Sequence, residues 1–454
     1  MMKNIYKSIK INALKQTMLV CASGMILLAS GCSSTDEDKL VDGKKKGEPT
    51  FFTMNMELSG VASSRFRAGG DIYSTEKEIK IDTVDVFLYN ESGFCDSHVA
   101  VPGNEFTLEG GVYKTNNRIP AATGNKKIFV TANLPASLVG KLENGMLNEA
   151  TQVAQTLRLG DLVKSGSIIM TSEPVACELL ASNMANENVL TIPIKRMTAK
   201  ITVEKSPSLI FGGVSGKTEN LLFAVANFNE RSFLSQRSDL HDPNWAEADF
   251  NPNEFYPRYD ENDDSRYSYV AVNNANIPNI AAYNTLYAAE NTSELHRKKE
   301  ITRILVRATF IPDLAVVKEG DNFVSKQTSS MGITSPTDFW VVALFNPQRE
   351  LYFFYTYSYA ADFALAHQIP VNEENIIHYI GGKCYWDIFL NGSNQWDVLR
   401  NDYYKCIINR IMSPGRALPA VPDPDEKPDA ETSIDASISI TPWTLITGGY
   451  ELTP

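Results

Sequence analysis

The chain is divided into many short runs of β-branched and aromatic residues, and this pattern constrains its fold more than any other feature. Typical runs are "KKIFVTANL", "TRILVRATFIP", "DFWVVALFN" and "CYWDIFL". Each is strand-sized and is bounded by Asn, Asp, Gly or Pro, as strands joined by turns are. Hydrophobic residues form 43% of the 454 residues and aromatic residues 10%, which is typical of globular chains. We therefore expect an all-β fold of two β-sandwich domains in tandem, with few short helices.

Two segments refine this expectation. Met146–Val163 carries apolar residues at helical spacing, so a helix is expected there. Asn188–Lys205, "NVLTIPIKRMTAKITVEK", is long and β-rich with Pro193 inside it, so it begins a second domain or crosses between two. We expect an N-terminal domain over 68–195 and a C-terminal domain over 196–454.

The N-terminus is a targeting segment that does not belong to the fold. Lysines precede an apolar run over 17–29, which is too short to span a bilayer comfortably. The run ends in "LLASGC", which resembles a bacterial lipobox and makes Cys32 the candidate lipidated residue. We expect a signal peptide over 1–31 and a solvated tether after it. An ordinary secretory signal cut nearby is the alternative.

The tether leads into a strand and then into a hinge that contains arginines. "TFFTMNMEL" alternates, and the residues on its apolar face are Phe52, Met54, Met56 and Leu58. "SSRFRAGGDI" follows, with Arg65 and Arg67 among small residues, a setting accessible to a protease. Residues 32–67 are therefore expected to form a separate segment of tether and first strand.

The C-terminus carries a last strand behind a Pro-rich linker over 419–431. This strand spans 433–454 and begins with isoleucines in one phase, while the residues after Pro442 follow the opposite phase. Its principal apolar residues are Ile434, Ile438, Ile440, Trp443, Leu445 and Leu452.

Composition and motifs exclude several functional classes. A net charge of −12 disfavours nucleic acid, which binds basic surfaces. The chain carries no G-x-S-x-G, H-E-x-x-H or Walker loop, so we expect no enzyme and no cofactor. "DENDDS", at 260–265, begins like a calcium loop but has Ser265 in place of the required glycine. The five histidines of the chain are scattered, so no metal site is expected.

Three features stay open at this level. Cys384 and Cys406 lie in consecutive strands and either pair or act as small buried hydrophobes. The aromatic run Phe353–Phe363 is either a sugar platform or, more commonly for strand tyrosines, core packing. The polar loop Ser238–Tyr267 is either functional or mobile.

Several motifs together carry a resemblance to a known family. They are the lipobox, "RAGG" after a strand, "KKIFVTANLP", "GDLVKSGSIIMTSEP", "IPIKRMTAKITVEK", "VLRNDYYKCIINRI" and "ISITPWTLITGGYELTP". In this order they resemble the Bacteroidales fimbrillins, the subunits of type V pili, and most of all the major shaft subunit of short fimbriae. The resemblance runs through most of the chain and is weakest in the Ser238–Tyr267 loop.

The resemblance implies a fold of two transthyretin-like β-sandwich domains. It also implies a sequence of export, proteolytic processing and assembly. A precursor lipidated at Cys32 reaches the outer membrane, and an extracellular arginine-specific protease cuts between Arg67 and Ala68, with Arg65 as the alternative. Cutting frees the first strand, and the C-terminal strand of a neighbouring copy replaces it. The implied partners are copies of the chain, accessory pilins, the protease and a host or bacterial surface receptor.

Two other functions remain in competition with this interpretation. One is a surface lipoprotein that binds a glycan without polymerising, and the other is an accessory pilin at the anchor or the tip. A shaft subunit must lose the segment before Ala68 and must carry a free C-terminal strand.

Overall fold

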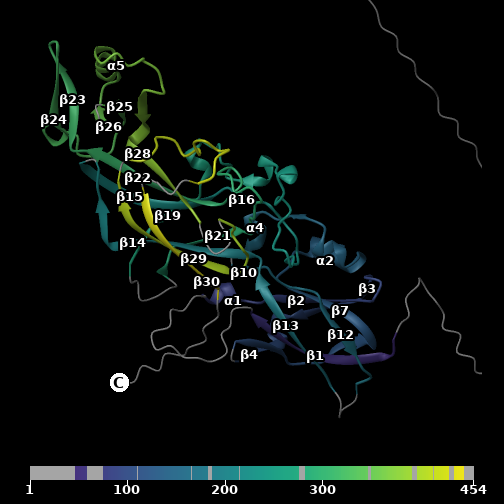
Figure 1. The fold of residues 1–454 in the computed structure, drawn as a ribbon. Helices are drawn as coiled ribbons and strands as arrows, with labels where there is room; N and C mark the ends of the chain where they lie inside the picture. Colours follow the sequence, from purple (N-terminus) through teal and green to yellow (C-terminus); the bar gives the residue numbers. More distant parts are fainter. Residues whose placement is uncertain are drawn as a thin grey trace, which may run out of the picture. The chain divides into compact units, whose positions relative to one another are not determined.

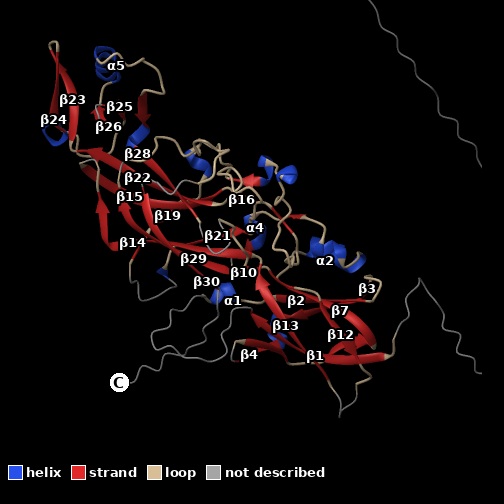
Figure 2. Ribbon diagram, in the orientation of Figure 1, coloured by secondary structure: helices blue, strands red, loops and turns tan. Residues whose placement is uncertain are grey.

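The computed structural model describes residues 47–58, 75–109, 111–164, 166–182, 187–213, 215–275, 282–345, 349–390, 396–412, 414–428 and 434–443. Strands dominate these residues (Figure 2). The α-helices are short: α1 (Glu76–Ile79), α2 (Ala136–Asn144), α3 (Asn148–Thr151), α4 (Leu159–Leu162) and α5 (Tyr357–Ala366). The prediction of an all-β fold with few short helices is confirmed. None of the described helices combines the length and the hydropathy needed to cross a membrane.

Single turns of 3-10 helix lie between several of the strands. They are η1 (Gly103–Glu105), η2 (Glu247–Asp249), η3 (Pro252–Glu254), η4 (Asp264–Arg266), η6 (Thr328–Met331) and η7 (Ile380–Gly382).

The N-terminal part of the described chain forms a ten-stranded sheet (Figure 1). The strand order is β3-β2-β7-β11-β13-β1-β5-β4, with β12 paired to β7 and β6 paired to β1. The strands are β1 (Pro49–Leu58), β2 (Thr83–Tyr89), β3 (Cys95–Pro102), β4 (Phe106–Glu109), β5 (Val112–Thr115), β6 (Ile119–Ala122), β7 (Gly124–Ala132), β11 (Met170–Ser172), β12 (Val175–Leu179) and β13 (Asn188–Arg196).

Strand β2 buries both of its faces. Val84 and Val86 belong to a first core, which also contains the apolar side chains of β1. Phe87 and Tyr89 point the other way and pack in a second cluster with Leu138 of α2. A strand that is covered on both faces needs an uninterrupted apolar run rather than an alternating one, and "VFLY" supplies it.

The C-terminal part forms two larger sheets around a shared core. One has the order β20-β14-β29-β30 with β21 paired to β14, and the other has the order β19-β15-β22-β28. Ile201 of β14 and Tyr404 of β29 share a core with Phe223 of β15, Ile304 of β22 and Trp386 of β28, which makes the pair of sheets a sandwich. The strands are β14 (Thr198–Phe211), β20 (Asn273–Asn274), β21 (Thr285–Ala289), β29 (Asp402–Ile411), β30 (Ile434–Pro442), β15 (Gly216–Ala226), β19 (Val270–Ala271), β22 (Arg303–Pro312) and β28 (Lys383–Phe389).

Smaller sheets complete the described chain. β23 pairs with β24, and β25 lies between β26 and β27 and packs against α5. Three two-stranded pairs join β8 to β17, β9 to β10 and β16 to β18. The strands are β23 (Leu314–Glu319), β24 (Asn322–Gln327), β25 (Phe339–Phe345), β26 (Arg349–Phe354), β27 (Ile376–Tyr379), β8 (Gln155–Thr156), β17 (Arg231–Ser232), β9 (Val163–Lys164), β10 (Ser167–Ile168), β16 (Phe228–Asn229) and β18 (Phe255–Tyr256).

The chain passes from the ten-stranded sheet to the C-terminal sandwich at Met197, between β13 and β14. β13 and β14 therefore lie in different sheets. That Asn188–Lys205 begins a second domain or crosses between two stays a prediction. The domain ranges 68–195 and 196–454 stay predictions.

The helix predicted over Met146–Val163 is wrong. The segment contains the one-turn helices α3 and α4 with strand β8 between them. Gln155 and Thr156 of β8 pair with Ser232 and Arg231 of β17. Backbone groups that a continuous helix would bond internally therefore form hydrogen bonds with a distant strand.

Two open features are decided by burial. Cys384 and Cys406 are free thiols in strands of different sheets, and both lie in the C-terminal core. In the aromatic run 353–363, Phe354 and Phe363 are buried in the cluster beneath α5. The run therefore packs a core, as expected for the commoner alternative.

Candidate functional site

The first strand, β1, lies within the ten-stranded sheet and is paired along both edges. On one edge it runs parallel to β13, from Phe52 opposite Asn188 to Leu58. On the other edge it runs antiparallel to β6 along its first half and to β5 along its second. Removing such a strand would leave unpaired backbone groups on β13, β5 and β6.

Alternate side chains of β1 point into the first core. The four residues predicted for the removable strand are each at most 1% exposed: Phe52, Met54, Met56 and Leu58. Burial of an apolar side chain contributes about 1.5–3 kcal/mol, so the four together contribute on the order of 6–12 kcal/mol. This is comparable with the net stability of a typical protein, roughly 5–15 kcal/mol. β1 is therefore integral to this core.

Polar contacts fix the register of β1 at its first residues. The Thr50 hydroxyl donates to the Leu180 carbonyl at 2.7 Å and accepts from the Ser182 amide at 3.0 Å. The Asn188 side chain donates to the Phe51 and Leu180 carbonyls, each at 2.9 Å. A slip by one residue would turn the apolar face away from the core, so these contacts and the core favour the same register.

The predicted lipidation and cleavage residues lie outside the described residues. They are Cys32, Arg65, Arg67 and Ala68. The described chain stops after Leu58 and resumes at Thr75, so both arginines belong to the connection between β1 and α1.

The chain resumes at a buried ion pair. The Glu78 carboxylate lies 3.0 Å from the Lys200 ammonium, and neither side chain is exposed. The Tyr287 hydroxyl donates to the same carboxylate at 2.6 Å. Burial lowers the pKa of Lys200, and the Glu78 charge opposes this shift. Removing either partner would leave an uncompensated buried charge.

Arg196 connects this ion pair to the end of β30. Its guanidinium donates to the Glu78 carbonyl at 2.9 Å and to the Trp443 carbonyl at 3.0 Å. It also lies 4.2 Å from the centroid of the Trp443 ring, a cation–π contact. The Trp443 ring stacks on Tyr287 with 5.7 Å between centroids. We call Glu78, Arg196, Lys200 and Tyr287 the Trp443 clasp.

The predicted donor residues are divided between β30, the clasp and the chain that follows. β30 pairs antiparallel with β29 along its length. Ile434 is buried, Ile438 packs against the C-terminal core, and Ile440 lies opposite Tyr404. Trp443 is fully buried in the clasp. Leu445 and Leu452 lie outside the described residues.

Sequence reasoning missed the clasp. Arg196, Thr198, Lys200 and Thr202 occupy alternate positions along β13 and β14, and all are fully buried. The sequence signal was this polar stripe, but a polar stripe on a strand normally faces water. The burial of Glu78 could not be predicted from the residues around it, because its partners Lys200 and Tyr287 come from distant strands.

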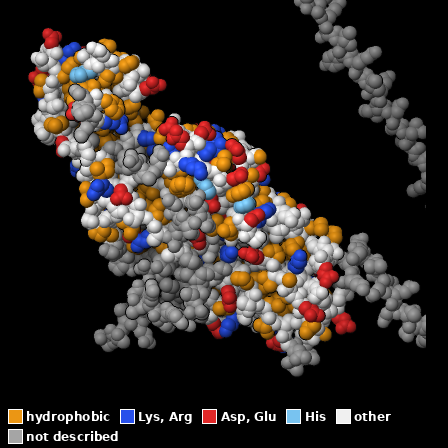
Figure 3. Space-filling view, in the orientation of Figure 1, with side chains coloured by type: hydrophobic (Ala, Val, Ile, Leu, Met, Phe, Trp, Pro, Cys, Tyr) orange, Lys and Arg blue, Asp and Glu red, His pale blue; other side chains and the backbone are white. Residues whose placement is uncertain are grey.

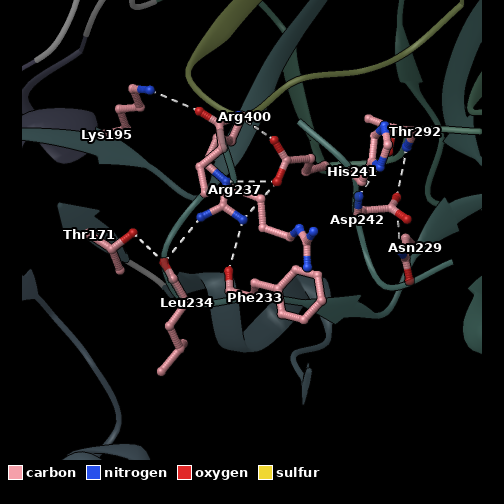
Figure 4. A network of polar contacts seen from close by, with 12 residues as sticks. Thr171, Lys195, Asn229, Phe233, Leu234, Arg237, His241, Asp242, Thr292 and Arg400 are labelled. Atoms are coloured by element: carbon pink, nitrogen blue, oxygen red, sulfur yellow. Dashed lines mark hydrogen bonds and ion pairs between the residues drawn. The ribbon is translucent and has the colours of Figure 1, made fainter. Parts of the chain in front are cut away.

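A second polar network lies around Arg400 (Figure 4). The Arg400 guanidinium donates to Glu290 at 2.9 Å, to the Leu234 carbonyl at 3.2 Å and to the Phe233 carbonyl at 2.9 Å. The Thr171 hydroxyl of β11 donates to the same Leu234 carbonyl at 2.6 Å. This network, the Arg400 joint, therefore connects the ten-stranded sheet to the C-terminal part through the loop after β17.

The long loop at 238–267 is packed against the protein. Asp242 and Asn244 are buried, and Phe255 and Tyr256 line a cavity of about 760 Å³ that Tyr287 also lines. Within the described residues, no group of three or more His, Cys, Asp or Glu side chains could hold a metal ion. The function of the loop stays open.

Charged side chains of both signs are interspersed on the face seen in Figure 3. This surface differs from the single-signed basic patch that nucleic-acid binding requires.

Two families match the chain in sequence. Residues 51–211 match "Major fimbrial subunit protein (FimA)", a range that begins in β1 and ends with β14. Residues 378–448 match "Major fimbrial subunit protein type IV, Fimbrillin, C-terminal", a range that contains β29 and β30. A comparison with curated proteins gave no match.

Solved structures with a similar trace include a fimbrilin (FimA) from Porphyromonas gingivalis W83, with 14% identity, a TM-score of 0.49, and coverage of 88% of this chain and 99% of that chain. The tip fimbrial protein Mfa3 from Porphyromonas gingivalis, with a C-terminal truncation, has 12% identity, a TM-score of 0.42, and coverage of 87% and 100%. TM-scores below 0.5 are too low to support the assignment, which therefore depends on the sequence matches.

Both matched families consist of fimbrial structural subunits, and their ranges together cover more than half of the chain. The prediction that the chain is not an enzyme is thereby confirmed, and so is its predicted place in fimbriae on the cell surface. The chain belongs to the fimbrillin family of fimbrial subunit proteins.

Proposed function

We propose that this fimbrillin is a shaft subunit that polymerises by donor-strand exchange and so supports adhesion, colonisation and biofilm formation. It reaches the outer membrane as a lipoprotein precursor anchored through Cys32. An extracellular arginine-specific protease cuts after Arg67, or after Arg65 as the alternative. The cut removes β1 together with the anchor, and the C-terminal chain of a neighbouring copy takes its place.

The observation that carries this proposal is the central position of β1. β1 is paired along both edges and buries one face. The connection that follows it in the chain contains Arg65 and Arg67. Loss of β1 would open a slot with hydrogen-bonding edges on both sides and an apolar floor. A strand from another molecule can restore both the ladder and the core.

The geometry of such an exchange favours a filament. Slot and donor are different surfaces of the subunit, since β1 and β30 lie in different sheets. A contact between unlike surfaces is heterologous, and a chain of such contacts forms an open filament unless the rotation closes a ring. The further partners proposed are accessory pilins and a host or bacterial surface receptor.

The test is to block the cut. Arg65→Ala combined with Arg67→Ala should leave a lipidated monomeric precursor, whereas Arg158→Ala, at an exposed arginine, should be processed normally. The measurements are N-terminal sequencing of the mature protein and an unboiled gel, in which polymers form a ladder. Normal ladders from the double variant would overturn the processing step. A normally cut wild type without ladders would favour the glycan-binding lipoprotein or an accessory pilin.

A further inference from the structure

We propose that the cavity lined by the second half of the long loop at 238–267 binds a short, uncharged saccharide. This proposal names the class of receptor for adhesion, and in that respect it rests on the proposed function. The cavity has a volume of about 760 Å³. Small-molecule sites in proteins typically measure about 300–1,000 Å³, so a short oligosaccharide has room there.

Three separate parts of the chain build the cavity. Residues 253–268 form one wall, α4 and β9 contribute Leu159 and Val163 to a second, and β15, β16 and β21 contribute Val225, Phe228 and Leu286 to the third. α4 and β16 each lie beside β21 (Figure 1). The cavity is therefore a product of the tertiary fold rather than of the loop alone.

One side of the cavity is apolar and incompletely covered. Leu159, Val163, Tyr256 and Leu286 line it, and each of them is only half-buried. Leu159 and Leu286 also pack against the C-terminal core, so they hold fixed positions. Apolar surface that the fold leaves uncovered gains free energy when the apolar face of a ligand covers it, and the C–H face of a sugar ring is such a surface.

Tyr256 is held in place from several directions. Its hydroxyl donates to the Arg266 carbonyl at 3.1 Å. Its ring meets the Phe228 ring edge to face with 6.1 Å between centroids, and the two residues are opposite each other in the β16–β18 pair. The ring therefore contributes a fixed apolar surface to the cavity.

The charged side chains around the cavity form pairs of opposite sign. The pairs are Arg158 and Glu230 at 3.9 Å, Arg258 and Asp260 at 2.7 Å, and Arg266 and Glu261 at 3.8 Å. Balanced pairs do not create the net positive field that attracts an anion, and they do not suit a wholly apolar ligand either. Sugar hydroxyls both donate and accept hydrogen bonds, so they can bond to cations and carboxylates alike.

Arg258 is the best-ordered donor of the cavity. Its Nε and Nη2 donate to Asp260 at 2.9 and 2.7 Å, and its Nη1 donates to the Asn253 side chain at 3.1 Å. Among the described residues these bonds use three of its five N–H groups, which leaves two for a ligand. A guanidinium held in this way is preorganised to donate to two neighbouring hydroxyls. We assign hydrogen bonding to Arg258 and to the partly exposed Glu261 carboxylate, and apolar contact to Tyr256.

The loop wall of the cavity lies between the two ranges that match fimbrial families, 51–211 and 378–448. The ligand that it selects is therefore a property of this chain rather than of the family.

The first test measures binding to the uncut precursor with Cys32→Ala. This change prevents lipidation, so the protein is handled without detergent, which would compete for an apolar cavity. The probes are oligosaccharides that end in glucose, galactose, mannose or fucose, the sialylated and sulfated forms of the same compounds, and laurate. An array selects the compounds that bind, and saturation-transfer difference NMR measures their affinity.

At least one uncharged oligosaccharide should bind, and Arg258→Ala should weaken it about tenfold, as expected for the loss of hydrogen bonds from a charged donor. Arg237→Ala is the matched control. Arg237 lies in the same loop and donates to Asp239 through the same two nitrogens, at 3.0 and 2.6 Å, but it does not line the cavity. Its affinity should equal that of the parent protein.

The second test fills the cavity. Gly160 lines it, and a Cβ added at Gly160 would meet no heavy atom within 4 Å, so Gly160→Phe can place a ring there without moving the backbone. This variant should lose saccharide binding while its circular dichroism and melting temperature stay unchanged. Gly140→Phe, in α2, has equally open surroundings away from the cavity and should bind as before.

Binding of sialylated or sulfated compounds alone, of laurate alone, or of none of the probes would overturn the inference. Saccharide binding that survives Gly160→Phe would show that the site lies elsewhere. The binding tests use uncut monomer, so their result is separate from the ladder that tests polymerisation. Ladders without saccharide binding would overturn this inference alone, and saccharide binding without ladders would overturn polymerisation alone.

Discussion

At the residue scale, the site depends on charges that are placed where water cannot reach them. Glu78 and Lys200 are both fully buried, and their contact is reinforced by the Tyr287 hydroxyl. Two charges removed from water lose hydration energy that their mutual attraction offsets only when both are present. The clasp is therefore sensitive to the loss of one member.

Lys200→Met should lower the free energy of unfolding by about 3–5 kcal/mol, because it leaves Glu78 charged, buried and without its cation. Lys217→Met is the matched control, since Lys217 pairs with Glu219 at the surface and is 68% exposed. The control should change stability by less than about 1 kcal/mol. Urea unfolding of both variants measures the difference, and equal losses would contradict the role of the buried pair.

Asp242 should make stability depend on pH. Burial raises its pKa from 3.8 to about 7, and Glu290 adds to the shift. The folded carboxyl holds its proton more tightly than the unfolded one, so its contribution to stability is complete below pH 3.8 and is lost as the pH rises through about 7. Asp242→Asn cannot ionise, so its stability relative to wild type should rise between pH 5 and 8.

The control for this titration is Asp239→Asn. Asp239 is partly exposed, and the hydrogen bond from Arg237 lowers its pKa, so it titrates only in acid. Its difference from wild type should stay flat between pH 5 and 8 in the same urea series. A flat difference for Asp242→Asn as well would show that this carboxyl does not titrate in that window.

At the element scale, β1 and β30 have opposite positions in their sheets. β1 is an interior strand that the proposed cut removes, whereas β30 is an edge strand that the clasp holds in place. Among the described residues, β1 therefore has hydrogen-bonding partners on both edges, whereas β30 has a partner on one edge.

Met54→Ala should destabilise the precursor by about 2–5 kcal/mol, because it leaves a cavity in the first core. It should leave mature polymers unaffected, since β1 is absent from them in the proposed cycle. Phe51→Ala, at a position 44% exposed on the same strand, is the control and should have little effect on either form. Thermal unfolding of precursor and polymer tests this, and an equal loss in the polymer would mean that β1 remains in it.

The sequence predicted the type of most strands but not every helix. β1, β7, β22 and β28 were expected from alternating or apolar runs, which are local signals. The helix over Met146–Val163 had the right spacing, but β8 pairs with a strand more than seventy residues away. α2 was missed although Pro135 precedes it and Gly145 follows it, both of which are helix boundary signals.

At the scale of the whole molecule, two buried arginines join the ten-stranded sheet to the C-terminal part. Arg196 connects it to Asn401 and Trp443, and Arg400 connects it through the loop that carries Leu234. Both arginines use backbone carbonyls as acceptors, so the connections depend on how the main chain folds.

Arg400→Met should weaken the joint and divide thermal unfolding into two transitions, because it leaves the buried Glu290 carboxylate without this cation and the Phe233 carbonyl without this donor. Arg237→Met is the control in the same loop, where the arginine pairs with Asp239 at the surface. Differential scanning calorimetry measures the number of transitions. A single unshifted transition in Arg400→Met would contradict the role of the joint.

The sequence alone determined the strand-rich fold, the alternation of Phe52, Met54, Met56 and Leu58, and the resemblance to the fimbrillins, because periodicity and motif order are local properties of the chain. Only the tertiary structure decided that β1 is paired on both edges, that Cys384 and Cys406 remain apart, and that the Trp443 ring is enclosed by Arg196, Lys200 and Tyr287. The physical reason is that pairing and burial join residues far apart in the chain. The sequence does not distinguish a charged residue that will be buried from one at the surface, because the partner that compensates the buried charge lies far away in the chain.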